Sequence, residues 1–203
     1  MYIIGLTGGI GSGKSTAANI LKDMGFKIID LDQITHKVLK SGESGHKKIS
    51  ENFGRKYFDN EDNIIREKLK EDIFSSNDLK KRIELILHPV IFDECKSELN
   101  NLKEEKYVVI VIPLLFETKN YLKLISQSLL IDCDEKLQLK RVIERDDISE
   151  AFARRIVTNQ MSRKDKIKLA DKVILNNSNF DNLRDQLENY YKVLLKEKNN
   201  AQI

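Results

Sequence analysis

The sequence predicts an α/β fold in which a five-stranded parallel sheet carries helices on both faces. Five short apolar runs typical of buried strands support this prediction, and stretches with helical spacing separate them. Parallel strands need long crossover connections, whereas antiparallel strands can be joined by tight turns, so these separations favour the parallel arrangement. The expected strands are residues 2–6, 27–31, 107–112, 128–132 and 172–175.

Length and composition indicate one α/β domain with insertions rather than two large domains. The 203 residues, of which 40% are hydrophobic and 33% charged, suffice for one substantial core and a smaller lobe. A helix-rich stretch between the second and third expected strands is too long for a simple crossover and is interrupted at Ser41-Gly42, Phe53-Gly54, Ser75-Ser76 and Pro89. We therefore expect one domain over residues 1–203, with an inserted helical lobe at about 34–105 and an arginine-rich helical lid at about 134–168.

The clearest helix in the sequence is the last one. Ser178 suits its N-cap position and Asp181 the third helical position, a pattern typical of helix starts. The residues expected on its apolar face are Phe180, Leu183, Leu187, Tyr190 and Leu194. In the inserted lobe, by contrast, His88-Pro89 is expected to break a helix, because proline removes a backbone donor and restricts the residue before it.

Charge and residue spacing exclude several classes of function. The net charge of +3, from 35 basic and 32 acidic residues, lacks the concentrated positive field of a nucleic-acid-binding protein. No apolar stretch approaches the length of a membrane span, and Met1 runs into the first strand without a basic leader. We therefore expect a cytoplasmic protein with no nucleic-acid or membrane partner. Cys95, Cys133 and the three histidines lack the spacing of a zinc site.

A glycine-rich segment directly after the first expected strand carries the strongest functional signal. Residues 8–16 read Gly-Gly-Ile-Gly-Ser-Gly-Lys-Ser-Thr and match the phosphate-binding loop pattern G-x-x-x-x-G-K-[ST], with a helical pattern following. Positive φ angles, with N–H groups turned toward phosphate oxygens, are expected at Gly8, Gly9, Gly11 and Gly13. The chain is therefore expected to bind a nucleoside triphosphate.

The residues after the last glycine supply the charged and hydroxyl groups of such a site. Lys14 is expected to reach the β- and γ-phosphates, and the Ser15 hydroxyl to ligate Mg²⁺. Thr16 can donate to the α-phosphate, and the N-terminal dipole of the following helix attracts the anionic phosphates.

Two aspartates follow the second expected strand, at the sheet edge where ligands of parallel sheets gather. In extended geometry, Asp30 and Asp32 place their carboxylates on one side of the chain. A carboxylate there can orient an acceptor hydroxyl and accept its proton during phosphoryl transfer. The alternative is that one aspartate only caps the helix beginning near Gln33. For Asp30 the two interpretations are balanced, and for Asp32 the catalytic one is favoured.

The helix beginning near Glu135 carries two arginines on one face. Arg141 and Arg145 are four residues apart, which is typical of an arginine-bearing lid that closes over a transferred phosphoryl group. Without the glycine-rich loop, a solvated basic face would be the favoured interpretation, since Arg154, Arg155, Arg163 and Lys164 follow.

The sequence is compatible with more than one role for each of two further residues, Glu117 and His88. Glu117 ends the segment Pro113-Leu114-Leu115-Phe116-Glu117 after the third expected strand, where it either holds Mg²⁺ through water or makes a local cap. His88 lies in the inserted lobe, the place where a phosphoryl-transfer enzyme commonly builds its acceptor site. A lone histidine is more often a cap or a packing residue than a catalyst.

Together these blocks resemble the dephospho-coenzyme A kinases over nearly the whole chain, and their order is more specific than any one block. One departure is Leu31, where the family usually has alanine; its side chain is expected to point away from the carboxylates. The matching blocks are residues 4–16, Ile29-Asp30-Leu31-Asp32, Phe53-Gly54, Leu87-His88-Pro89, residues 113–117, Gln138-Leu139-Lys140-Arg141 with Arg145-Asp146, Gln160, and Ala170-Asp171 followed by Asn176-Asn177.

The resemblance implies a three-layer P-loop kinase fold and a concrete reaction. ATP would phosphorylate the ribose 3′-hydroxyl of dephospho-coenzyme A, giving coenzyme A and ADP in the last step of coenzyme A biosynthesis, with Mg²⁺ accompanying ATP. The two nucleotides are the expected small-molecule partners. The sequence gives no oligomeric state.

The resemblance also assigns residues to the parts of this reaction. Asp32 matches the presumed general base, Arg141 the lid arginine, and Lys14 completes the catalytic set; Ser15 is the expected metal ligand. The ATP-binding residues are Gly11, Ser12, Gly13, Lys14, Ser15, Thr16, Arg145, Asn176 and Asn177, the last two beside the adenine. The acceptor-binding residues are Thr7, Asp32, His88, Leu115 and Glu117.

Two rival functions share part of this evidence. A nucleoside or nucleotide kinase would have the same loop, aspartate and arginine lid, and differs only in its acceptor. A GTP-binding switch would need an Asn/Thr-Lys-x-Asp motif, and its nearest match, residues 118–121, ends in Tyr121.

Overall fold

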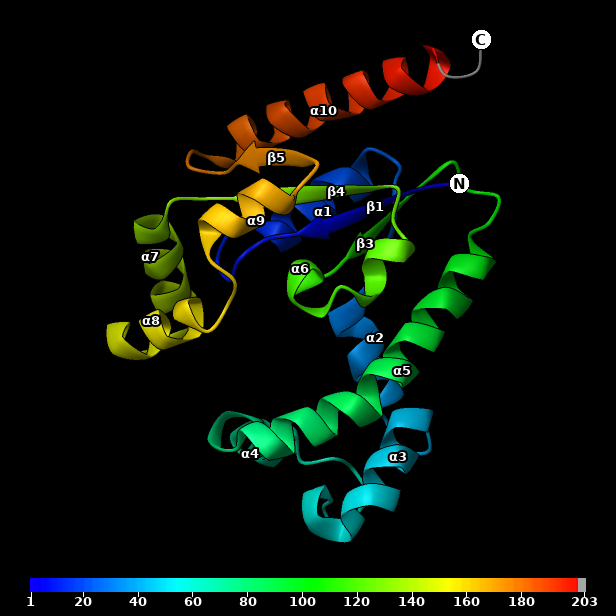
Figure 1. The fold of residues 1–203 in the computed structure, drawn as a ribbon, viewed down its shortest axis with the longest axis vertical. Coiled ribbons are helices and arrows are strands. Elements are labelled where there is room, and N and C mark those ends of the chain that lie inside the picture. Colours follow the sequence, from blue (N-terminus) through cyan, green and yellow to red (C-terminus); the bar gives the residue numbers. More distant parts are fainter. Residues whose placement is uncertain (201–203) are drawn as a thin grey trace. The chain divides into compact units, whose positions relative to one another are not determined.

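The computed structural model describes residues 1–200, with the side chains of these residues except at positions 70, 74 and 198–200. A five-stranded sheet has the strand order β2-β3-β1-β4-β5, and Figure 1 labels its strands β1, β3, β4 and β5. The strands are β1 (Tyr2–Thr7), β2 (Lys27–Asp30), β3 (Tyr107–Val111), β4 (Gln127–Asp132) and β5 (Lys172–Leu175). The strand β1 pairs in parallel with β3 and β4, and β4 pairs in parallel with β5. The predicted fold class is confirmed, and each strand boundary agrees with the sequence-based expectation to within one residue.

The chain divides into two compact units, which are described separately. The first consists of residues 1–28 together with the chain from residue 104 onward, and the second of residues 29–103. No helix in the part of the chain that the structure describes has the length and apolar character needed to cross a membrane.

The first unit is built around four strands with helices on both sheet faces. On one face, α1 (Lys14–Asp23) and α10 (Phe180–Asn200) enclose a core with alternate strand residues such as Ile4 and Val109. On the other face, the Leu115 side chain of α6 (Leu115–Thr118) lies next to Gly5, and α9 (Arg163–Leu169) packs against β4. The helices α7 (Glu135–Asp146) and α8 (Glu150–Thr158) pack against each other. A short 3₁₀ helix spans Asn120–Lys123.

The start of α10 differs from the expectation. The helix begins at Phe180, and Asn179 rather than Ser178 acts as its cap, because the Asn179 side-chain oxygen accepts a hydrogen bond from the Asn182 N–H at 3.0 Å. Phe180 is exposed, whereas Leu183, Leu187 and Leu194 are buried as expected.

The second unit is helical. It contains α2 (Leu31–Val38), α3 (Ser44–Phe53), a 3₁₀ turn at Gly54–Tyr57, α4 (Arg66–Ser75) and α5 (Asn77–Asn101). The helix α5 packs against each of the other three helices, and its buried face carries Ile83, Leu87, Ile91, Cys95 and Leu99.

The expected helix break at Pro89 is wrong, because α5 continues through it. Proline at position 89 removes the N–H that would pair with the carbonyl of Leu85. Both residues are exposed, Leu85 by 75%, so water can satisfy that carbonyl without a break in the helix.

Candidate functional site

The glycine-rich loop connects β1 to α1 and turns sharply at two glycines. Gly11 has a φ of 73° and Gly13 a φ of 92°, values that only glycine adopts without strain. The N–H of Ser12 donates to the carbonyl of Gly9 at 3.1 Å, which closes the turn. The helix α1 then begins directly at Lys14, so its N-terminal N–H groups face the loop.

The other two glycines are required for a different reason than expected. Positive φ is absent at Gly8 and Gly9, which corrects the expectation for these positions. Both positions instead lack space for a side chain. A Cβ at Gly8 would lie 2.5 Å from Ser12 Oγ, and one at Gly9 would lie 2.5 Å from Gln138 Nε2. The loop is therefore held by close packing on the β4 and α7 side.

The loop after β5 is hydrogen-bonded to the glycine-rich loop through Asn176. Its side-chain amide donates to the Ser12 carbonyl at 2.8 Å, and its backbone N–H donates to the Asp132 carbonyl at 2.7 Å. Arg141 Nη1 in turn donates to the Asn176 carbonyl at 3.1 Å. A Cβ at Gly13 would collide with the Asn176 amide. These contacts bring two predicted site residues, Asn176 and Arg141, together with the phosphate loop.

Asn177 fixes the start of α7. Its Oδ1 accepts from the Asp134 N–H at 2.8 Å, and its Nδ2 donates to Asp134 Oδ2 at 2.7 Å. The two arginines expected on one lid face have different partners, because Arg145 forms a bidentate pair with Asp146 at 2.8 Å while Arg141 binds the backbone after β5.

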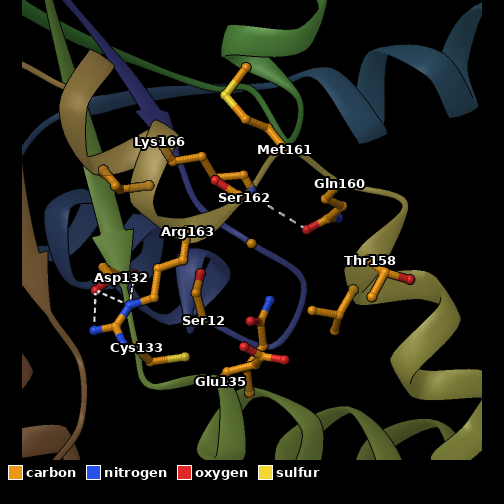
Figure 2. A pocket seen from close by; sticks show the side chains of 14 residues that line it. Ser12, Asp132, Cys133, Glu135, Thr158, Gln160, Met161, Ser162, Arg163 and Lys166 are labelled. Carbon is orange, nitrogen blue, oxygen red and sulfur yellow. Dashed lines mark hydrogen bonds and ion pairs between the residues drawn. The ribbon is translucent and has the colours of Figure 1, made fainter.

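A cavity of about 300 Å³ lies beside the loop in the first unit (Figure 2). Arg163 spans its lower part, bound to Asp132 through Nε at 2.9 Å and to Asp134 through Nη1 at 2.7 Å. The side chain of Arg163 is still 40% exposed, so these ion pairs lie at the protein surface. The lining residues are Gly9, Ser12, Leu130, Asp132, Cys133, Glu135, Gln138, Val157, Thr158, Gln160, Met161, Ser162, Arg163 and Lys166.

Lys166 is the buried cation of this cavity. Its Nζ donates to Gln160 Oε1 at 3.3 Å, and the same oxygen accepts the N–H of Ile10 at 3.1 Å. Burial lowers the pKa of the Lys166 ammonium below its ordinary value; the nearby Glu117 opposes this shift, and Lys14 adds to it.

The expected acceptor residues of the first unit have mainly internal partners. Glu117 Oε1 accepts the Met161 N–H at 3.1 Å, a contact with a residue 44 positions away rather than the expected local cap. The Thr7 hydroxyl donates to the Pro113 carbonyl at 3.5 Å. Leu115 is fully buried and exposes no surface to a ligand.

Two of the residues predicted to bind polyphosphate and Mg²⁺ lie at the start of α1. Ser15 is exposed in the first turn, next to Lys14. Among the described residues, no cluster of three His, Cys, Asp or Glu side chains forms a protein metal cage. This donor set fits Mg²⁺ that is held by one hydroxyl and mainly by phosphate oxygens and water.

In the second unit, the two aspartates have different local structures. Asp30 is the N-cap of α2, and its Oδ1 accepts the Asp32 N–H at 2.8 Å. The expected extended geometry is wrong for Asp32, because α2 begins at Leu31 and Asp32 lies in its first turn. Asp32 is exposed and lines a shallow groove along α2 together with Gln33, His36, Lys37 and Lys40. His88 is half-buried on α5.

Sequence reasoning missed the roles of Lys166, Arg163 and Asp132. Asp132 is the last residue of β4, so its position at a strand end was a usable signal. Lys166 gave no such signal, because it lies in a polar run between exposed lysines.

Comparisons with known proteins agree with this geometry. The model of the CoaE family, dephospho-CoA kinase, matches residues 2–182. The dephospho-CoA kinase of Nitrosospira multiformis is 38% identical over 192 residues, which cover 95% of this chain and 96% of the relative.

Two solved structures are similar over almost their full lengths. The crystal structure of TT1252 from Thermus thermophilus has a TM-score of 0.81 at 30% identity and covers 97% of each chain. The dephospho-CoA kinase from Campylobacter jejuni has a TM-score of 0.72 at 30% identity, covering 97% of this chain and 98% of that chain. The chain therefore belongs to the dephospho-CoA kinase family and has its α/β P-loop kinase fold.

Proposed function

We propose that the protein transfers the γ-phosphoryl group of ATP to the ribose 3′-hydroxyl of dephospho-coenzyme A, the last step of coenzyme A biosynthesis. The observation that carries this proposal is the phosphate loop of a family member, with Gly11 and Gly13 at positive φ directly before Lys14. Such a loop presents backbone N–H groups and a helix N-terminus to polyphosphate.

ATP would be bound by the loop and the segments joined to it. Residues 11–16 surround the phosphates, with Lys14 at the β- and γ-phosphates and Ser15 as the magnesium ligand. When bound, Mg²⁺ would neutralise part of the charge on these phosphates. By the family resemblance, the Asn176-Asn177 segment would lie beside the adenine, and Asn176 is hydrogen-bonded to the loop that would bind the phosphates.

The acceptor would be activated by Asp32. Its carboxylate is exposed at the start of α2, and a carboxylate can orient a hydroxyl and take its proton as the new bond to phosphorus forms. Residues 34–105 would form the acceptor-binding lobe with His88. In the first unit, Thr7 and Glu117 are the residues proposed to contact the acceptor. Leu115 supports this site through packing, since it has no exposed surface.

Residues 134–168 would act as a lid. Arg141 would move from the Asn176 carbonyl to the transferred phosphoryl group, and Arg145 would add a second cation once it leaves Asp146. We also propose a cytoplasmic location, where ATP is supplied.

The acceptor can be tested directly. The purified protein is incubated with ATP, Mg²⁺ and either dephospho-coenzyme A or a panel of nucleosides and nucleoside monophosphates. We expect phosphorylation of dephospho-coenzyme A with little turnover of the panel. Rapid turnover of the panel without dephospho-coenzyme A turnover would favour a nucleotide kinase instead, and a strong preference for GTP over ATP would favour a GTP-binding protein.

A further inference from the structure

A lysine on α9 is buried against the residues that surround the phosphate loop. Lys166 is only 7% exposed, although its neighbours Ile167 and Leu169 are 39% and 53% exposed. Burying an ammonium group is unfavourable unless an anion or several acceptors compensate it. The orientation of α9 therefore buries a cation and leaves two apolar side chains exposed to solvent.

The two carboxylates that act electrostatically on Lys166, Glu117 and Asp132, each accept hydrogen bonds from other donors. Asp132 is bound by the guanidinium of Arg163, and Glu117 Oε1 accepts the Met161 N–H. Within residues 1–200, the Lys166 ammonium donates a hydrogen bond to the neutral side-chain oxygen of Gln160. This oxygen orients the ammonium but is neutral, and the carboxylate of Glu117 offsets part of the positive charge without forming an ion pair with Lys166 among the described residues.

Three features connect Lys166 to the phosphate loop. Gln160 Oε1 accepts a hydrogen bond from the Lys166 ammonium (Figure 2) and another from the loop N–H of Ile10. Ser12 lines the same cavity, and its Oγ is buried without a hydrogen-bond partner among the described residues. The positive charge of Lys14 lies close enough to act on Lys166.

We propose that Lys166 is a second phosphate-binding cation, which contacts the polyphosphate of the bound nucleotide together with Lys14, and that Gln160 holds its ammonium beside the loop. This inference rests on the proposed function. Two ammonium groups near one loop repel each other. A bound polyphosphate would attract both of them, and this attraction would outweigh their repulsion. Ser12 Oγ offers a hydroxyl donor on the same side.

The test compares Lys166→Met with Lys168→Met. Both changes remove one positive charge from α9, but Lys168 is exposed, so its variant is the matched control. Binding of Mg²⁺-ATP and of inorganic tripolyphosphate is measured by calorimetry, and thermal unfolding is measured without ligand. We expect Lys166→Met to weaken the binding of both ligands about 10- to 100-fold, the usual scale for one hydrogen bond to a charged group. Its Tm should be equal to or above that of the wild type, because a costly buried charge is gone.

Other outcomes overturn the proposal. If Lys166→Met binds both ligands as Lys168→Met does, the lysine does not contact phosphate. If Lys166→Met lowers the Tm or fails to fold, the lysine has a structural role instead. Lys166→Arg keeps the charge and should recover most of the affinity; no recovery also counts against the proposal. If the wild type binds neither ligand, the proposed function itself fails, whereas normal wild-type binding with an unaffected Lys166→Met overturns this inference alone.

Discussion

The side-chain amide of Asn176 donates a buried hydrogen bond of 2.8 Å to the backbone carbonyl of Ser12, which is 164 residues away in the chain. Gly13 lies against the same amide and has no space for a Cβ. The segment after β5 and the phosphate loop thus fix each other's position. A change on either side is transmitted to both the proposed adenine site and the phosphate site.

We predict that Asn176→Asp destabilises the protein and weakens ATP binding. The carboxylate has nearly the shape of the amide but cannot donate to the Ser12 carbonyl, which leaves two buried acceptors facing each other. The expected loss in the free energy of unfolding is about 1–3 kcal/mol, measured by urea denaturation. Asn182→Asp is the control, because Asn182 is exposed in the first turn of α10, where a negative charge is favourable. Equal stability of the two variants would contradict the prediction.

Lys14→Met should abolish phosphate binding. The ammonium at the start of α1 is the strongest charge that the loop presents to the β- and γ-phosphates, and methionine keeps the length of the side chain without the charge. We expect turnover to fall by at least about 10²-fold, as for other groups that stabilise transition-state charge. Lys22→Met changes an exposed lysine on the same helix and should keep wild-type turnover. Similar kinetics for both variants would exclude the assigned role of Lys14.

Substitutions of the two aspartates at the start of α2 should have different effects: one should lower turnover and the other should lower stability. Asp32→Asn is expected to keep ATP affinity and to lower turnover by at least about 10²-fold, the usual scale of a general base. Asp30→Ala removes the N-cap acceptor for the Asp32 N–H and should reduce the free energy of unfolding by about 0.5–2 kcal/mol. Steady-state kinetics and denaturation of both variants check this division. Normal turnover of Asp32→Asn would remove that residue from the catalytic role.

The pair Asp171 and Ser128 should contribute an acid-sensitive part of the stability. The Ser128 hydroxyl and N–H donate to Asp171 Oδ2 at 2.6 Å and 2.8 Å, and these bonds lower the pKa of Asp171 below its ordinary value of 3.8. The folded state therefore favours the ionised carboxyl. Its contribution is fully present above the ordinary pKa of 3.8 and is lost as the pH falls through the lower pKa of the folded state.

Urea denaturation of wild type and Asp171→Asn between pH 7 and pH 2.5 measures this effect. The stability difference between them should be constant near neutral pH and should shrink as the pH falls through about 3.8, where half of the unfolded carboxyls are protonated. The exposed Asp185→Asn shows whether the loss of any negative charge has the same effect. A difference that stays constant down to pH 2.5 would contradict the prediction.

Predictions from local sequence patterns were reliable where local physics decides the structure. The apolar runs gave the five strands, and the glycine pattern placed the phosphate loop between β1 and α1. The same reasoning failed at Pro89, because an exposed helix face tolerates a missing backbone donor. It failed for Asp32 because the helix begins two residues earlier than the polar run at Gln33 suggested.

The sequence by itself determined the fold class, the phosphate loop and the family resemblance, because these follow from hydropathy periods and residue types over short distances. Only the tertiary structure decided that Lys166 is buried, that Gln160 joins it to Ile10, and that Asn176 is bound to Ser12. These contacts join residues that are 6 to 164 positions apart in the chain. Lysine side chains are usually exposed, so the burial of Lys166 could not be expected from its residue type. Their positions depend on how β4, β5 and α9 pack around the loop, which no local pattern encodes.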